Sequence, residues 1–400
     1  MIESPHLAHD RGVAVIAASI AATWVVALPA MLLGAMAVLL QRDLGFGEKE
    51  LGIAIATAFA TGGLVAVPIG RLADRIGPQL TIRLGLAFAA VALVGIAVAT
   101  DGWVRMAAWM AFAGAGVTTI QVGTNVLITR AVPAARRGVA FGIKQSAVPL
   151  ASMGAGLALP LIAVTFGWQA AFIGAAAAVP VIAVLIPSAG PNVRRSADAQ
   201  RLDLPLGSLV LLAIGVAFAS AGGNVTAAFL VPSIVDRGMS PGAAGLVLAI
   251  GSLVGVAARI GAGWLGDRLG RQSLLVVATM LGMGAIGYVG LALADEPVVI
   301  VASAALAFGG GWGWAGLMLL AVSQLAPTQP GRAMGIVQVG PMSGAVAGPL
   351  IFGFVAEELG FSAAWGIAAL LAIMGGLIIL ATRSRVRPQR DAHAAGSAAR

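Results

Sequence analysis

Two basic side chains of this sequence lie inside long apolar stretches, where a charge needs a partner. Lys144 is in the stretch 139–164, and Arg259 is in the stretch 241–262. All 16 acidic residues fall in loops, tails or the ends of stretches, so no carboxylate neutralises either cation from within. Ionisable residues inside a membrane usually mark the path of a substrate or an ion. The pair therefore predicts a binding site for a small organic or inorganic anion.

Each cation also has a structural interpretation, which stays open on the sequence alone. A long basic side chain can place its charge at the membrane surface while its stem lies in the apolar region. Arg259 can in addition cap backbone carbonyls or pair with Asp267. Polar side chains near Lys144 extend the candidate site: Gln121 and Asn125 share one face of the predicted helix 104–128 with Thr118, and Gln145 follows Lys144. Such groups more often join membrane helices by hydrogen bonds.

The elements that must position these residues are membrane helices. Hydrophobic residues make up 59% of the chain and charged residues 10%, whereas about 25% is charged in a typical soluble protein. Stretches of about 20 apolar residues are long enough to cross a bilayer as helices. We therefore predict an all-α integral membrane protein with twelve transmembrane helices. The predicted spans are 13–40, 50–69, 79–99, 104–128, 139–164, 169–187, 206–232, 241–262, 272–293, 298–325, 333–356 and 361–382.

Groups for catalysis or cofactor binding are not evident in this sequence. There is no cysteine, no nucleophile and base pair, no metal-binding cluster and no phosphate-binding loop, so we predict no enzyme, cofactor or metal site. The three histidines, His6, His9 and His393, lie in the tails, which disfavours a conventional proton relay. The mechanisms left are uniport, anion exchange, or symport in which an organic acid or Lys144 carries the proton.

An eight-residue loop occurs twice, 193 residues apart. It reads Gly-Arg-Leu-Ala-Asp-Arg-Ile-Gly over 70–77 and Gly-Trp-Leu-Gly-Asp-Arg-Leu-Gly over 263–270. Matching residues continue at this offset on both sides, so one half repeats the other. We predict a six-helix bundle over 1–187, a linker over 188–205, a second six-helix bundle over 206–382 and a basic tail over 383–400.

The distribution of the 24 Lys and Arg residues predicts how the chain lies in its membrane. Eighteen of them fall in the tails, the linker, the two repeated loops and the other connections predicted on the same side. Positive residues accumulate in cytoplasmic loops, so both termini are expected in the cytoplasm, with the protein in the inner membrane. This pattern explains the net charge of +8 without a nucleic-acid partner. The expected partners are a small-molecule substrate and the lipid bilayer, and we expect a monomer.

The repeated loop resembles that of the major facilitator superfamily, Gly-x-Leu-Ala-Asp-Arg-x-Gly-Arg-Arg, although Pro78 and Gln79 replace the final basic pair in the first copy. The resemblance implies two pseudo-symmetric bundles, a central cavity and alternating access, with helices 5 and 8 adjacent. The position of Arg259 also resembles one used by carboxylate-transporting facilitators. The resemblance adds candidate lining residues from cavity helices, which are Trp24, Asn224, Thr226, Trp312, Trp314 and Gln338.

The resemblance further implies two gate contacts. Asp74 is expected at the start of helix 11, near Gly331 and Arg332, and Asp267 at the start of helix 5, near Arg137 and Gly138. A carboxylate is stabilised at a helix N-terminus by the helix dipole. The candidate gate residues are Gly70, Asp74, Arg75, Gly77, Gly263, Asp267, Arg268, Gly270, Arg332 and Arg137.

The sequence thus predicts transport of a small anion by alternating access. A multidrug or metabolite exporter of the same superfamily is the alternative, although the exporter pattern Gly-x-x-x-Gly-Pro-x-x-Gly-Gly does not occur in the predicted fifth helix. A third hypothesis is a membrane sensor that binds a ligand without transporting it. Import and export are both consistent with the sequence.

Overall fold

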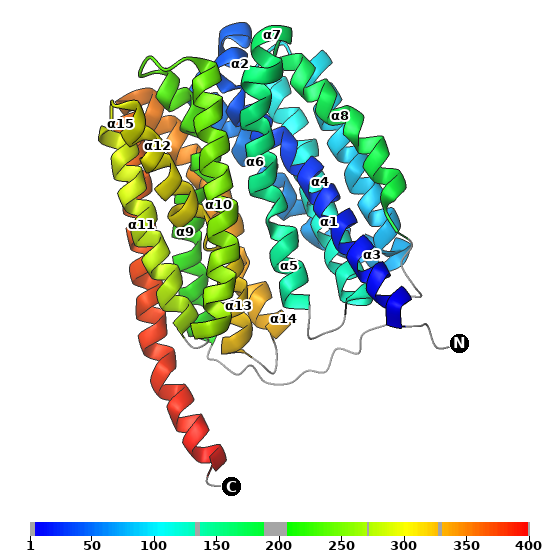
Figure 1. Cartoon of the computed structure of the whole chain (residues 1–400), viewed down its shortest axis with the longest axis vertical. Coiled ribbons are helices and arrows are strands. Elements are labelled where there is room, and N and C mark those ends of the chain that lie inside the picture. Colours follow the sequence, from blue (N-terminus) through cyan, green and yellow to red (C-terminus); the bar gives the residue numbers. More distant parts are fainter. Residues whose placement is uncertain (1–4, 133–136, 188–205, 270–271, 327–329, 399–400) are drawn as a thin grey trace.

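The protein is a bundle of long helices in a computed structural model, which describes residues 5–132, 137–187, 206–269, 272–326 and 330–398 (Figure 1). Side chains are described for these residues except 5–11, 137–139, 267, 269, 323, 330–332 and 387–398. The start of α1 and the end of α15 lie on the same side of the bundle, which we call the terminal side (Figure 1). We call the other side the opposite side.

The helices of each half follow one another along the chain. Those of the first half are α1 (Pro5–Ala35), α2 (Ala37–Leu44), α3 (Glu48–Val98), α4 (Trp103–Ala131), α5 (Arg137–Gln145), α6 (Ala147–Ala158), the π-helix η2 (Leu159–Ala163), α7 (Val164–Phe166) and α8 (Trp168–Leu185). Those of the second half are α9 (Leu206–Val235), α10 (Pro241–Leu269), α11 (Ser273–Leu293), α12 (Pro297–Leu306), the π-helix η4 (Ala307–Trp312), α13 (Ala315–Leu325), α14 (Pro330–Val337) and α15 (Val339–Ala398).

Ten helices of the described chain are long and apolar enough to cross a membrane, where the sequence predicted twelve. Two of the ten are unusually long, at 51 residues for 48–98 and 54 residues for 333–386. A straight helix of 51 residues would measure about 77 Å, more than twice the hydrocarbon core of about 30 Å. Each long helix departs from helical geometry at a glycine, Gly77 or Gly360, and so covers two predicted spans. The count of twelve crossings stays a prediction.

The backbone repeats the 193-residue offset of the sequence. Gly45 (φ +67°) and Gly238 (φ +90°) form one pair at this offset, and Gly167 (φ +84°) and Gly360 (φ +85°) form another. A positive φ strongly favours glycine, which has no Cβ to clash with the backbone. Gly77 also has a positive φ of +80°, and its counterpart lies outside the described residues. The duplication therefore extends to the turns that end equivalent helices.

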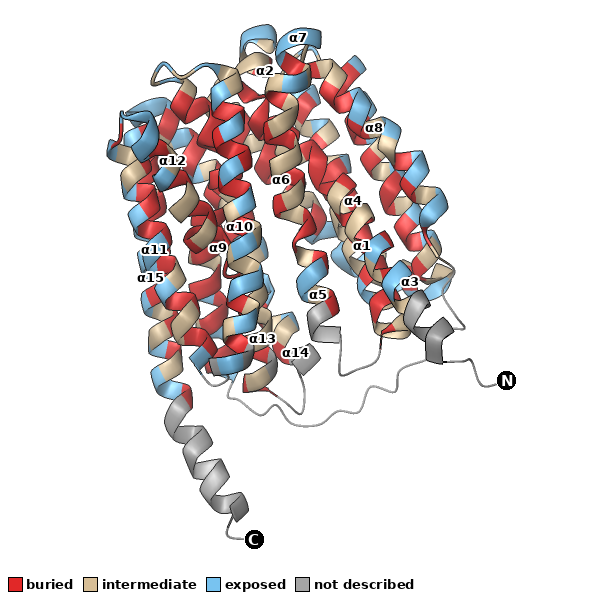
Figure 2. Ribbon diagram, viewed as in Figure 1, coloured by how far each residue is buried: buried red, intermediate tan, exposed pale blue. Residues whose placement is uncertain are grey.

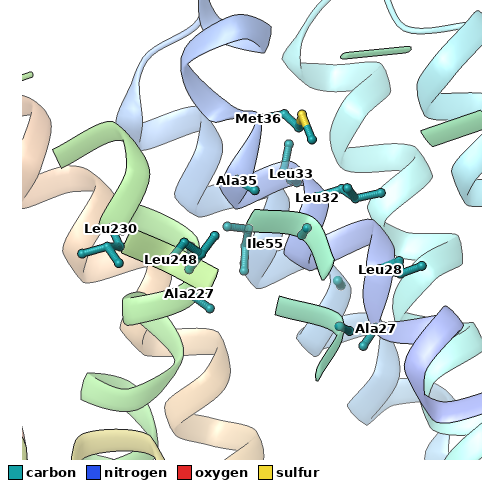
Figure 3. Close-up of a cluster of buried hydrophobic side chains, with 14 of the residues drawn as sticks. Ala27, Leu28, Leu32, Leu33, Ala35, Met36, Ile55, Ala227, Leu230 and Leu248 are labelled. Carbon is teal, nitrogen blue, oxygen red and sulfur yellow. The ribbon is translucent and has the colours of Figure 1, made fainter. Parts of the chain in front are cut away.

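Small residues bring the two halves together towards the opposite side. A Cβ added at Gly34 of α1 would lie 2.7 Å from the carbonyl oxygen of Ala227 in α9, and one added at Gly156 of α6 would lie 2.6 Å from that of Gly245 in α10. In the absence of a strong hydrophobic drive within lipid, such close backbone contacts hold membrane helices together. One buried cluster continues across both halves; it includes Leu28, Leu33, Ile55, Leu230 and Leu248 (Figure 3).

The outer surface is apolar along much of the bundle (Figure 2). Large aliphatic side chains are exposed on both halves, such as Leu64 at 81%, Val184 at 81% and Leu293 at 75%. An aqueous protein rarely exposes so many of them, whereas lipid solvates them at no cost. The protein is therefore a multi-pass integral membrane protein.

Candidate anion-binding site

Lys144 is buried in the first half of the bundle, with 1% of its surface exposed. It lies in the last turn of α5, and its Nζ donates hydrogen bonds to Gln121 Oε1 at 2.5 Å and to Asn125 Oδ1 at 2.7 Å. Both acceptors come from α4. The polar face predicted for this helix therefore meets Lys144, although Thr118 on the same helix donates to the backbone oxygen of Gly62 instead.

The partners of Lys144 leave its charge without a counterion. Amide oxygens accept hydrogen bonds but carry no net charge, and the ammonium group has three donors. Two of these donors are used, and Lys144 forms no ion pair with an Asp or Glu among the described side chains. A bound anion would supply both the missing acceptor and the missing charge.

Arg259 of α10 reaches across the junction between the halves. Its Nη1 donates to the backbone oxygen of Gln145 at 3.2 Å, and its Nη2 donates to the backbone oxygen of Trp312 at 3.1 Å. The guanidinium carbon lies 4.9 Å from the centre of the Trp312 ring, within the range of a cation–π interaction. The Nε of Arg259 and the Oε1 of Gln145 are buried without a hydrogen-bond partner. In this structure Arg259 therefore caps backbone carbonyls, as one structural interpretation predicted. The alternative pairing with Asp267 stays a prediction, because the side chain of Asp267 lies outside those described.

Both carbonyls that Arg259 binds lie at breaks in a helix. Pro149 has no N–H, so the helical bond that its N–H would make to the oxygen of Gln145 cannot form. Accordingly α5 ends at Gln145, and α6 begins at Ala147. Trp312 is the last residue of η4, and a turn separates it from α13. Two local irregularities, far apart in the sequence, therefore present free acceptors to one arginine.

The structure gathers one group from the predicted lining residues. We call Lys144, Gln121, Asn125, Gln145, Arg259 and Trp312 the cation cluster, because hydrogen bonds, a ring contact or chain adjacency connect its members. Trp24 of α1 instead packs against α6, where its ring lies 3.6 Å from the position of a Cβ added at Gly154. The role of the cluster in substrate binding stays a prediction.

The other predicted lining residues have structural partners or lie apart from the cation cluster. Asn224 donates to the backbone oxygen of Ser220 at 2.8 Å, within its own helix. Thr226 bonds the Tyr288 hydroxyl at 3.2 Å, and the indole N–H of Trp314 donates to the backbone oxygen of Gly311 at 2.8 Å. Gln338 is exposed at the break between α14 and α15.

The predicted gate residues are described only in part. Gly77 has the positive φ expected of a tight turn, whereas a Cβ added at Gly70 or Gly263 would meet no atom within 4 Å. Asp74 and Arg75 are exposed, and the Arg268 guanidinium lies 3.8 Å from the centre of the Trp264 ring. The side chains of Asp267, Arg137 and Arg332, together with Gly270, lie outside the described residues. The two gate contacts therefore stay predictions.

Two features of this region were missed by reasoning from the sequence. Pro149 lies four residues after Gln145, and this spacing is the sequence signal that the Gln145 carbonyl is freed. Ser152 and Ser252 form a buried hydrogen bond of 2.9 Å between the halves, and no sequence pattern links them.

Comparison with known proteins agrees with this architecture. The chain is 27% identical to human monocarboxylate transporter 11 over 89% of this chain and 82% of that protein. It is 28% identical to a chloramphenicol resistance protein of Streptomyces lividans, over 82% of this chain and 88% of that one. It is 26% identical to a gentisate transporter of Corynebacterium glutamicum, over 85% and 81% of the two chains.

A solved structure and a family model complete the comparison. The D-xylose-proton symporter aligns with a TM-score of 0.74 at 14% identity, covering 92% of this chain and 96% of that chain, which shows a shared fold. The model of the Major Facilitator Superfamily matches twice, over residues 18–212 and again over 212–399, in agreement with the internal repeat. The fold and these matches point to a membrane transporter rather than an enzyme. The chain belongs to the Major Facilitator Superfamily.

Proposed function

We propose that the protein transports a small organic anion by alternating access, with Lys144 and Arg259 as the countercharges. The observation that carries the proposal is the cation cluster itself. Two basic groups lie in the membrane region, and every acceptor described for them is an uncharged amide or backbone oxygen. Charge in this environment is expensive unless it is paired, so an anionic ligand is the partner that best satisfies the site.

The chemistry of the cluster favours a carboxylate with an organic body. Arginine binds carboxylates through two parallel hydrogen bonds, and Arg259 has an unpartnered Nε beside its two terminal nitrogens. The ring of Trp312 next to the guanidinium offers an apolar surface to the rest of such a molecule. The names of two relatives, a monocarboxylate transporter and a gentisate transporter, agree with this class.

Efflux of a neutral drug is the second candidate, because a chloramphenicol resistance protein is among the relatives. The two candidates differ in what the cations do. A neutral solute gains nothing from a second positive charge, whereas an anion gains Coulomb energy from each. The same experiment can therefore distinguish them.

The test is uptake into liposomes that contain the purified protein. The labelled solutes are pyruvate and benzoate as carboxylates and chloramphenicol as the neutral compound. A charged hydrogen bond contributes about 1.5–3 kcal/mol, so Lys144→Gln and Arg259→Gln should each lower carboxylate uptake at low concentration by about tenfold or more. Arg105→Gln is the control, because Arg105 is exposed and pairs with Asp101. Unchanged carboxylate uptake in both variants would overturn the assignment, and chloramphenicol transport alone would favour efflux.

We also propose that the terminal side faces the cytoplasm of the cell, with the protein in the inner membrane. The distribution of Lys and Arg supports this orientation. Because the chain has no cysteine, a single introduced one reports its own location. A membrane-impermeant maleimide added to intact cells should label Asp101→Cys, at the turn between α3 and α4, and leave Ser384→Cys unlabelled. The reverse pattern would contradict the orientation.

The gate contacts remain part of this proposal. Asp74 would bind the start of α14 near Arg332, and Asp267 the start of α5 near Arg137, as the family resemblance implies. Asp74→Asn should then slow transport while leaving binding of the anion intact, because Asp74 is exposed and is not a member of the cation cluster.

A further inference from the structure

The contact between the halves along α6 and α10 ends at Arg259. The two helices run antiparallel, and Pro160 lies near Gly242, Gly156 near Gly245, and Ser152 bonds Ser252. The last contact of this series towards the terminal side is the hydrogen bond from Arg259 to Gln145. The series extends over about 22 Å, taken as 15 residues at a rise of about 1.5 Å each.

Beyond Arg259 the two helices separate. A Cβ added at Gly142 of α5, or at Gly261 or Gly263 of α10, would meet no atom within 4 Å. The ribbons of α5 and α10 diverge towards the terminal side in the same region (Figure 1). The bond from Arg259 to Gln145 therefore lies at the terminal-side end of the close packing between these two helices.

The acceptor in this bond exists because of Pro149. With any other residue at this position, a backbone N–H would be available to the oxygen of Gln145, and α5 could continue into α6. Proline leaves that oxygen free in a buried setting, where an unsatisfied carbonyl is unfavourable. The Nη1 of Arg259 donates to this oxygen, so one half of the bundle supplies the donor and the other half supplies the acceptor.

We propose that the bond from Arg259 to the Gln145 carbonyl is a latch between the halves, which a bound anion releases, and that the protein is consequently an anion exchanger. In this scheme Pro149 is a positioning residue. The inference rests on the anion site proposed above. A carboxylate is a stronger acceptor for a guanidinium than a carbonyl is, so a bound anion replaces the Gln145 oxygen. Without an anion, opening the latch leaves Arg259 without this acceptor. The empty protein therefore changes slowly between its two transport conformations.

The experiment compares two fluxes of labelled pyruvate and benzoate in liposomes that contain the full chain. Exchange is measured with the unlabelled anion inside, and net uptake is measured with empty liposomes. In the wild type we expect exchange to be about tenfold faster than net uptake or more, because one charged hydrogen bond must open unaided in the empty state. Pro149→Ala restores the helical donor to Gln145, so net uptake should rise and the ratio should fall towards one.

Pro341→Ala is the matched control. Pro341 also follows a helix break, the one between α14 and α15, but Arg259 donates to the oxygens of Gln145 and Trp312 and not to a carbonyl at that break. This variant should retain the wild-type ratio. A wild-type ratio near one, with clear carboxylate flux, would overturn the latch and leave the proposed function intact. If neither the wild type nor a proline variant transports a carboxylate, both the latch and the proposed function are overturned. An equal fall of the ratio in both proline variants would also reject the latch, because it would show a general effect of removing a helix break.

A cross-linking measurement tests the latch without changing Pro149. The Oγ atoms of Ser152 and Ser252 are 2.9 Å apart, and the chain has no cysteine, so Ser152→Cys together with Ser252→Cys gives one oxidisable pair. Pyruvate or benzoate should slow formation of this disulfide about threefold or more, because release of the latch lets the halves separate. Chloride at equal ionic strength is the control. If neither pyruvate nor benzoate changes the rate of cross-linking relative to chloride, the latch is refuted.

Discussion

Replacing Lys144 with methionine should separate the stability of the protein from its function. Methionine is similar in length to the lysine stem and has no charge, so the buried volume is nearly conserved. The change removes two charged hydrogen bonds, to Gln121 and Asn125, each contributing about 1.5–3 kcal/mol. It also removes a buried ammonium group whose desolvation costs several kcal/mol. These terms nearly cancel, so the free energy of unfolding should change by about 1 kcal/mol or less.

The effect on anion binding has no such compensation. A carboxylate 4 Å from the ammonium group gains about 4 kcal/mol at an effective dielectric constant of about 20. An energy of about 4 kcal/mol corresponds to nearly three orders of magnitude in affinity. A longer distance between the two charges, or water between them, lowers this value. We therefore expect the concentration for half-maximal uptake to rise at least about tenfold in Lys144→Met.

The assay measures both quantities on the same preparation. Thermal unfolding in detergent gives the midpoint without ligand and its rise with added pyruvate or benzoate, and liposome uptake gives the half-maximal concentration. The expected variant has a wild-type midpoint without anion and a reduced rise with it. A variant that unfolds several degrees earlier yet binds the anion with unchanged affinity would refute the reasoning, because Lys144 would then be a structural residue.

Two further predictions concern glycines that the fold requires. Gly156→Ala should lower the unfolding midpoint and hinder contact between the halves, because its Cβ would lie 2.6 Å from a backbone oxygen of α10. Overpacking of this kind typically costs about 1–3 kcal/mol. Gly174→Ala is the control and should match the wild type, because a Cβ at Gly174 would meet no atom within 4 Å. Gly360→Ala should cost about 1–2 kcal/mol, because its φ of +85° is strained for alanine. Gly366→Ala in the same helix is its control, and equal midpoints for these two variants would contradict the strain argument.

Much of the architecture was predictable, because a bilayer leaves few choices to a chain. Apolar stretches of sufficient length become helices, since their backbone groups have no other partner in lipid. The offset between the repeated loops recurs in the backbone, where Gly45 with Gly238 and Gly167 with Gly360 share a positive φ. The separation into ten rather than twelve helices depends on the backbone at Gly77 and Gly360, where helical geometry breaks only at single residues.

The candidate site was predictable in its members but not in its connections. Lys144, Gln121 and Asn125 were recognisable because helical periodicity places the two amides on one face near a buried charge. Arg259 was recognisable as a charge in an apolar stretch, but its acceptors were not. The π-helix Ala307–Trp312, which contains three consecutive glycines, was likewise not predicted from the sequence.

The sequence by itself determined that this protein lies in a membrane, that its halves are duplicated and that two cations lack an intramembrane carboxylate. These properties depend on residue type and spacing, which are local. Only the tertiary structure decided that Arg259 binds the oxygen of Gln145, 114 residues away, and that of Trp312. Such bonds depend on which carbonyls two separate helix breaks leave free and on how closely the halves pack, and neither follows from the order of residues along one helix.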